Sequence, residues 1–114
     1  MRHLKKKKIG KGTDHKRKLL RTLASSLFLY EKITTGYANA RALRPYAEKA
    51  ITTAKPGGLA ARRLLLQKLS PMAAKKAVEV LGLKFKERKG GYLRLTKLNN
   101  PHAGNSRVLV ELVE

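Results

Sequence analysis

The residues of this chain that are best able to do chemistry are cations, and they are densest at its start. The first 21 residues contain ten lysines and arginines and one acid, Asp14, so this segment has a formal charge of +9. Cationic side chains neutralise phosphates and release their counterions. Four ring-bearing residues also lie among lysines or arginines: His3, His15, Tyr92 and His102. Because such rings stack on unpaired bases, the pattern predicts binding to folded RNA, although Tyr92 by itself is more typical of a packing residue.

The acidic residues are scattered, and none pairs with a histidine at a helical spacing. They are Asp14, Glu31, Glu48, Glu79, Glu87, Glu111 and Glu114. A zinc site would need three or four ligands, and the sequence contains no cysteine. The pairs Gly57-Gly58 and Gly90-Gly91 are typical of helix stops and turns. We therefore expect no catalysis, no metal, no cofactor and no small-molecule substrate.

Positive charge extends over the whole chain. The formal net charge is +20, and +11 of it remains in residues 22–114. This charge destabilises a compact state by self-repulsion, which an anionic partner would relieve. Nucleic acid is the first candidate and an anionic membrane the second. However, no apolar run reaches the roughly 18 residues of a membrane span, and the lack of cysteine fits a cytoplasmic protein.

The first twelve residues lack the pattern of a folded segment. Leu4 and Ile9 are isolated apolar positions among lysines and two glycines. A segment that buries so little apolar surface does not offset its loss of chain entropy. We predict a basic N-terminal extension over residues 1–12 that is disordered alone and ordered by RNA, followed by a single α+β domain over residues 13–114.

Apolar residues at helical spacing predict three helices in the first part of this domain. The first starts at an N-cap, Thr13 or Asp14, and continues to about residue 29. The second starts at Asn39 and has an apolar stripe made of Ala40, Leu43, Ala47, Ala50, Ile51 and Ala54. Pro45 should kink this helix or mark its true start. The third covers residues 59–69.

A fourth helix should begin with Ser70 as N-cap and Pro71 at the first helical position. We expect it to end at Gly82 and to bury one set of side chains: Met72, Ala73, Ala77, Val80 and Leu81.

Three segments are typical of strands: 32–35, 92–98 and 108–113. The last two are separated by a loop and predict a hairpin, which is marginal alone, so the strand at 32–35 should join it. The expected fold class is α+β, with about four helices packed on a small sheet of about three strands.

Several blocks of the sequence resemble the bacterial large-subunit ribosomal protein seventeen family, in order and over nearly the whole chain. They are Met1-Arg2-His3 with the lysines that follow, Asp14-His15-Lys16-Arg17, Leu23-Ala24-Ser25-Ser26-Leu27, Lys32-Ile33-Thr34-Thr35, the block from Ala40 to Lys49, Ala61-Arg62-Arg63-Leu64, the block from Arg88 to Arg94, and Val110-Glu111-Leu112-Val113. The opening tripeptide is weak alone, but the threonine pair, the Leu43–Lys49 block, the Gly-Gly-Tyr turn and the ending are specific together.

The resemblance implies a structural protein of the large ribosomal subunit that binds 23S rRNA. It implies an α+β fold, no catalysis and no cofactor. It also implies a position on the solvent side toward the polypeptide exit region, with neighbouring large-subunit ribosomal proteins, at one copy per ribosome in the cytoplasm.

Carried onto this sequence, the resemblance places RNA contacts in the extension, at His15, Arg17 and Arg21, and near the glycine turn. Together with the other basic positions, the predicted RNA-binding residues are Arg2, His3, Lys5, Lys6, Lys7, Lys8, Lys11, His15, Lys16, Arg17, Arg21, Arg41, Arg44, Arg62, Arg63, Arg88, Lys89, Tyr92, Arg94 and Lys97. No matched set of base-reading side chains lies on one helix, so we expect readout of shape and backbone.

Two other classes of protein fit a small basic chain. A DNA-binding architectural protein usually has a dimer interface or an apolar wedge for the minor groove, and neither is clear in this sequence. A membrane-active amphipathic protein would use the basic start and apolar face of the helix at 14–29. The chain also has apolar stripes for a closed core, which favours a folded RNA-binding domain.

Overall fold

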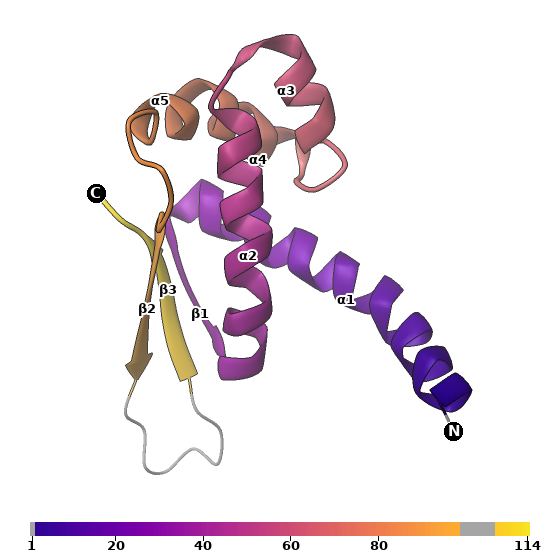
Figure 1. Ribbon diagram of the computed structural model, residues 1–114. Coiled ribbons are helices and arrows are strands. Elements are labelled where there is room, and N and C mark those ends of the chain that lie inside the picture. Colours follow the sequence, from indigo (N-terminus) through magenta and orange to yellow (C-terminus); the bar gives the residue numbers. More distant parts are fainter. Residues whose placement is uncertain (1, 99–106) are drawn as a thin grey trace.

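The computed structural model of the chain describes residues 2–98 and 107–114, with side chains from Asp14 onward (Figure 1). Its elements are α1 (Arg2–Tyr30), β1 (Lys32–Gly36), α2 (Tyr37–Ala54), α3 (Gly58–Leu65), α4 (Pro71–Lys76), the π-helical turn η1 (Ala77–Leu81), α5 (Gly82–Lys84), β2 (Leu93–Leu98) and β3 (Arg107–Leu112). Because α4, η1 and α5 are consecutive, the described residues form four helical stretches and one sheet, and the predicted α+β class is confirmed.

The sheet is antiparallel, with β3 between β1 and β2. Lys32 lies opposite Glu111 in the β1–β3 pair, and Leu93 lies opposite Leu112 in the β2–β3 pair. The predicted hairpin and the predicted third strand are therefore both confirmed. Residues 99–106, which connect β2 and β3, lie outside the described residues.

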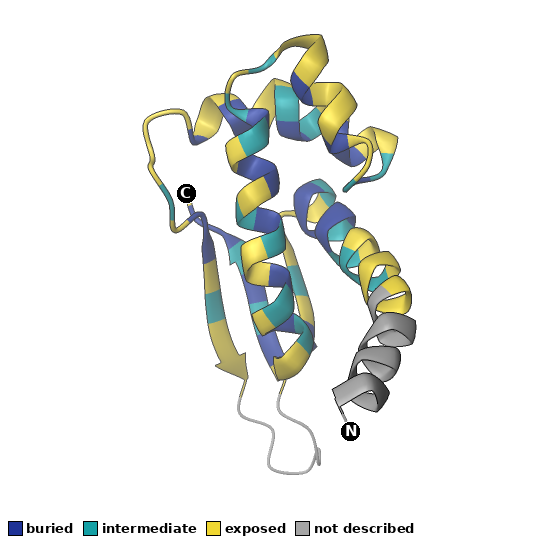
Figure 2. Cartoon of the chain, turned by 45° about the vertical axis from the view of Figure 1, so that its right-hand side comes forward, coloured by how far each residue is buried: buried dark blue, intermediate teal, exposed yellow. Residues whose placement is uncertain are grey.

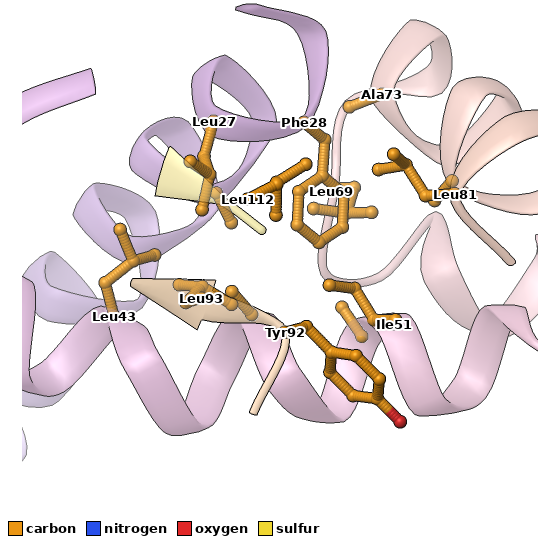
Figure 3. Close-up of a cluster of buried hydrophobic side chains, with 14 of the residues drawn as sticks. Leu27, Phe28, Leu43, Ile51, Leu69, Ala73, Leu81, Tyr92, Leu93 and Leu112 are labelled. Atoms are coloured by element: carbon orange, nitrogen blue, oxygen red, sulfur yellow. The ribbon is translucent and has the colours of Figure 1, made fainter. Parts of the chain in front are cut away.

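The helices bury one face of this sheet. α2 lies beside the sheet in Figure 1 and in front of it in Figure 2, and its buried residues belong to the same core cluster as those of the strands. Figure 3 shows Leu27 and Phe28 of α1 in one cluster with Ile51 of α2 and Leu112 of β3. The stripe predicted for the second helix is confirmed, since the buried residues of α2 are Ala40, Leu43, Ala47, Ala50, Ile51 and Ala54.

Two helices start earlier than predicted. α1 begins at Arg2, so its backbone continues beyond the predicted caps Thr13 and Asp14. α2 begins at Tyr37 directly after the extended Gly36, and the amide of Asn39 donates to Thr35 Oγ1 at 3.5 Å. A helix start at Asn39 or Pro45 is therefore wrong, because the chain turns from β1 into α2 without a loop. We also predicted that residues 1–12 are disordered without RNA. The side chains of this segment lie outside the part of the chain that the structure describes, so the prediction is not tested.

The start of the fourth helix is confirmed. Ser70 Oγ accepts from the Ala73 N–H at 3.4 Å, and Pro71 is the first helical residue. The Ser70 N–H itself donates to Ser25 Oγ at 2.9 Å. This bond joins the cap of α4 to the buried side of α1.

The buried face and the end of this helix differ from the prediction. Ala73, Ala77 and Leu81 are buried, but Met72 is 72% exposed and Val80 is exposed as well. The π-helical turn at Ala77–Leu81 places an extra residue in the turn, which shifts the phase of a pattern built on 3.6 residues per turn and explains the exposure of Val80. Met72 precedes this turn, and α4 buries the next two residues, Ala73 and Ala74, in its place. The helical stretch does not end at Gly82, because this residue is the first of α5.

Glu31 follows α1 with a left-handed backbone, φ 68°, and its carboxylate contacts two lysines. Oε2 lies 3.2 Å from Lys76 Nζ and Oε1 lies 3.5 Å from Lys84 Nζ. The hydrogen bond from Lys76 lowers the pKa of Glu31 below 4.5, while partial burial opposes the shift. Because the folded state has the lower pKa, this contribution to stability is present above pH 4.5 and is lost as the pH falls.

The Glu31→Gln variant tests this linkage. Near neutral pH it should unfold at a temperature lower than the parent by no more than about 5 °C, because such pairs are half-exposed. Thermal unfolding followed by circular dichroism should show this difference shrinking below about pH 4. A difference that stays constant down to pH 3 would mean that the backbone at residue 31, and not the carboxylate, is responsible.

Candidate nucleic-acid interface

A cleft lined mostly by cations lies between α1, α2 and the segment that follows α3. Its volume is about 360 Å³, and it is lined by Arg17, Lys18, Arg21, Tyr46, Gln67 and Lys68, which we call the basic cleft. Arg17 and Arg21 are four residues apart on α1, so they project from the same face of this helix. Lys68 faces them from the segment between α3 and α4. Residues far apart in the sequence therefore place four positive charges in one cleft.

Main-chain carbonyls hold the walls of the basic cleft. Arg21 Nη2 donates to the Leu69 carbonyl at 3.0 Å, and the Tyr46 hydroxyl donates to the Lys68 carbonyl at 2.7 Å. The Lys68 ammonium lies 5.6 Å from the centroid of the Tyr46 ring. Within residues 14–98 and 107–114, no carboxylate forms an ion pair with a cation of the cleft. These charges are therefore available to an anion.

Tyr46 lines the basic cleft with an uncharged phenol. Burial raises the pKa of its phenol above 10.0, and the Arg21 guanidinium opposes the rise. The phenol therefore keeps its proton near neutral pH and can donate to the Lys68 carbonyl. Since the folded state has the higher pKa, this contribution to stability is present below pH 10 and is lost as the pH rises further.

Two other predicted residues, Arg41 and Lys97, meet at one end of the sheet. The guanidinium carbon of Arg41 lies 5.8 Å from the centroid of the Tyr37 ring, and the Lys97 ammonium lies 5.2 Å from it. Tyr37 was not among the predicted site residues. Its spacing of four residues from Arg41 would have indicated this neighbour, but only after the helix start was placed at residue 37.

Tyr92 belongs to the core and not to the surface. It is 1% exposed, and its ring centroid lies 5.2 Å from that of Phe85. Its hydroxyl points away from the cluster (Figure 3) and donates to the Arg88 carbonyl at 3.1 Å. Lys55 also donates to this carbonyl, and its ammonium lies 4.7 Å from the Tyr92 ring. The packing interpretation of Tyr92 is therefore correct, and we leave it out of the proposed RNA contacts.

Three predicted arginines also make contacts within the protein. Arg44 lies 3.9 Å from Glu48, and Arg94 lies 3.9 Å from Glu111. Arg88 Nε donates to the carbonyls of Gly90 and Gly91, at 3.2 Å each, and so braces its own turn. Glu48 accepts from the Gly91 N–H at 3.3 Å, which ties this turn to α2.

The remaining predicted residues lie in two groups. His15, Lys16, Arg62, Arg63 and Lys89 are exposed. The side chains of Arg2, His3, Lys5, Lys6, Lys7, Lys8 and Lys11 lie outside the described ones, as does His102. The predicted set is thus divided among the basic cleft, the end of the sheet, the glycine turn and α3.

The sequence interpretation missed four residues of the basic cleft. Lys18 directly follows Lys16 and Arg17 in the sequence, so these two predicted residues could have indicated it. Tyr46, Gln67 and Lys68 reach the cleft only because α2 packs against α1 and α3 packs against α2, and no local pattern in the sequence indicates these contacts.

Neither a membrane span nor a metal centre is found in the part of the chain that the structure describes. No helix there is both long and apolar enough to cross a membrane. The same residues contain no group of three or more histidines and acids that could hold a metal ion.

The fold and the basic cleft define a class of protein: a small, strongly basic α+β domain with a surface suited to a polyanion. Residues 19–113 match the family model described as ribosomal protein L17. A protein of Hydrogenobaculum sp. named large ribosomal subunit protein bL17 is 43% identical, with full coverage of both chains. A protein of the same name from Endomicrobium trichonymphae is 41% identical over 93% of this chain and 92% of its own. The chain belongs to the ribosomal protein L17 family, which confirms the resemblance seen in the sequence.

Proposed function

We propose that this protein is a structural component of the large ribosomal subunit that binds and stabilises folded 23S rRNA. Membership of the ribosomal protein L17 family supports the ribosomal role, since the relatives are named as large-subunit proteins. The observation that carries RNA binding is the basic cleft, whose four cations have no carboxylate partner among the described residues. The protein acts without catalysis or cofactor, at one copy per cytoplasmic ribosome.

The proposal includes a position on the solvent side of the subunit, toward the polypeptide exit region, with other large-subunit proteins as neighbours. This position rests on the family resemblance. The surface of the molecule agrees with this position, because cationic side chains can contact rRNA and exposed apolar residues such as Met72 and Leu83 can contact neighbouring proteins.

One helix connects the RNA contacts to the core. Arg17, Lys18 and Arg21 lie on α1, and Leu27 and Phe28 of the same helix are fully buried. Phosphates held in the basic cleft are thus coupled to the packed domain over residues 13–114. The cations of the extension over residues 1–12 precede them on the same chain. Contacts to phosphates fix the position and orientation of the protein on the RNA, and they do not directly read the base sequence.

Replacing Arg17 and Lys18 together by glutamine should weaken the binding of 23S rRNA and make it less sensitive to salt. Neither side chain has an ion pair or a hydrogen bond among the described residues, so the fold should be retained. Each lost phosphate contact lowers the slope of log affinity against log salt by about 0.7–0.9, so two lower it by roughly 1.5. Filter binding at several salt concentrations measures this slope.

The matched control replaces Lys75 and Lys86 by glutamine, which removes the same charge from exposed positions outside the proposed contacts. This control should leave the slope nearly unchanged. An equal loss of slope in both variants would mean that net charge alone, and not the basic cleft, governs binding. Duplex DNA that competes as well as rRNA at physiological salt would contradict the ribosomal assignment itself.

A further inference from the structure

Tyr37 is an exposed aromatic residue that two cations approach, and it lies outside the basic cleft. Its side chain is 41% exposed, and the Arg41 guanidinium and Lys97 ammonium lie 5.8 Å and 5.2 Å from its ring centroid. The other tyrosines differ. Tyr30 is 72% exposed but has no cation at its ring among the described residues, Tyr46 is half-buried, and Tyr92 is in the core.

The fold builds this cluster from both edges of the sheet. Tyr37 and Arg41 lie on the first turns of α2, directly after β1. Lys97 is in β2, and the register places it opposite Val108, which in turn lies opposite Thr35. Residues opposite one another share a face of the sheet, and Thr35 and Val108 are buried on the side that α2 covers. Lys97 therefore reaches toward α2 at the margin of this face.

The surroundings of the cluster are free of acids. Residues 32–47, 93–98 and 107–110 contain no aspartate or glutamate. Among the described side chains, neither Arg41 nor Lys97 takes part in an ion pair. The first turn of α2 also has no side-chain cap on its N–H groups, and the helix dipole adds a partial positive charge there. An anion that approaches Tyr37 would thus meet positive charge on several sides.

From these observations we infer that Tyr37, Arg41 and Lys97 form a binding point for an unpaired nucleotide of the RNA. The base stacks on the Tyr37 ring, and the adjoining phosphates contact Arg41 and Lys97. Stacking suits a ring that is held at the surface by neighbouring cations, because aromatic and guanidinium planes both present a face to a base. This inference rests on the proposed function and adds to it a single-stranded contact separate from the basic cleft.

Cross-linking in purified ribosomes tests the inference directly. Short-wave ultraviolet light joins stacked bases to aromatic side chains, and trypsin then releases residues 33–41 with Tyr37 and residues 22–32 with Tyr30 as separate peptides. We expect a nucleotide adduct on the 33–41 peptide and none on the 22–32 peptide. Adducts confined to other parts of the chain would overturn the inference and leave the proposed function intact. A chain without any RNA adduct would count against both.

Substitutions separate stacking from charge. Tyr37→Phe keeps the ring and should bind 23S rRNA within about twofold of the parent, whereas Tyr37→Leu should bind about tenfold more weakly, with little change of salt slope. Tyr30→Leu is the matched control and should have no effect. If Tyr37→Leu binds as tightly as Tyr37→Phe, no base stacks on this residue. Thermal unfolding of each variant checks that the comparison is made between folded proteins.

Discussion

A chain that lacks residues 2–12 is expected to bind 23S rRNA at least about tenfold more weakly at physiological salt, yet to unfold at nearly the same temperature as the full chain. The deleted segment contains six lysines and arginines and no acid. If each of the six contacts one phosphate, the slope of log affinity against log salt falls by about 4 to 5. This is a larger change than any single substitution in the basic cleft can produce.

Stability should be retained because the core begins after the deleted segment. Among the described residues, the first buried apolar side chain is Ala24, and only partly buried positions such as Leu20 pack on the cluster before it. Circular dichroism should therefore give melting temperatures that agree within about 2 °C, while filter binding gives the affinities. A large fall in melting temperature would show that residues 2–12 are part of the folded domain. Unchanged binding would remove them from the RNA contacts.

Gly82→Ala should destabilise the protein, with a melting temperature lower by roughly 5–15 °C. A Cβ atom at this position would lie 2.7 Å from the Ala54 carbonyl oxygen, a distance that real Cβ atoms do not show. The neighbour is backbone at the end of α2, so it cannot rotate away as a side chain can. Gly82 itself has helical dihedral angles, φ −60° and ψ −40°. Alanine would otherwise favour this helix by about 1 kcal/mol, so any net loss must come from the close contact.

Gly90→Ala is the matched control for this substitution. A Cβ atom at Gly90 would have no neighbour within 4 Å, and its φ is not in the left-handed region. Thermal unfolding of the two variants, followed by circular dichroism, compares a glycine at a close helix contact with one in an open turn. If Gly82→Ala were as stable as the control, α2 and α5 could move apart to make room for the Cβ atom without loss of stability, and the close contact would not be the reason for a glycine here.

The secondary structure was predictable because its signals are local. The alternation of Val108, Val110 and Leu112 and the stripe of α2 are properties of consecutive residues, and both were found in the structure. The class of the fold followed from their order along the chain. The family could also be inferred, because specific blocks such as the Gly-Gly-Tyr turn lie in the expected order.

What could not be predicted depends on contacts between distant segments. Gly82 is needed because the Ala54 carbonyl lies too close to leave room for a Cβ atom. Val80 is exposed because of a π-helical turn, which a pattern of regular helical spacing does not indicate. Tyr92 is surrounded by cations in the sequence, yet Phe85 and Lys55 cover its ring in the fold. The sequence therefore predicted a cationic surface, but not which of the aromatic residues are exposed on it.

A structural role in the large subunit can be tested by following this protein through a sucrose gradient of a cell lysate, with mass spectrometry of each fraction. We expect the protein to sediment with the large subunit at one copy per particle and to stay there after a high-salt wash. The wash matters because salt weakens phosphate contacts, so a basic protein that is held by charge alone is released. A structural component that also packs against folded rRNA and neighbouring proteins should stay. Protein that remains at the top of the gradient, or that leaves the subunit in the wash, would contradict a structural role in the ribosome.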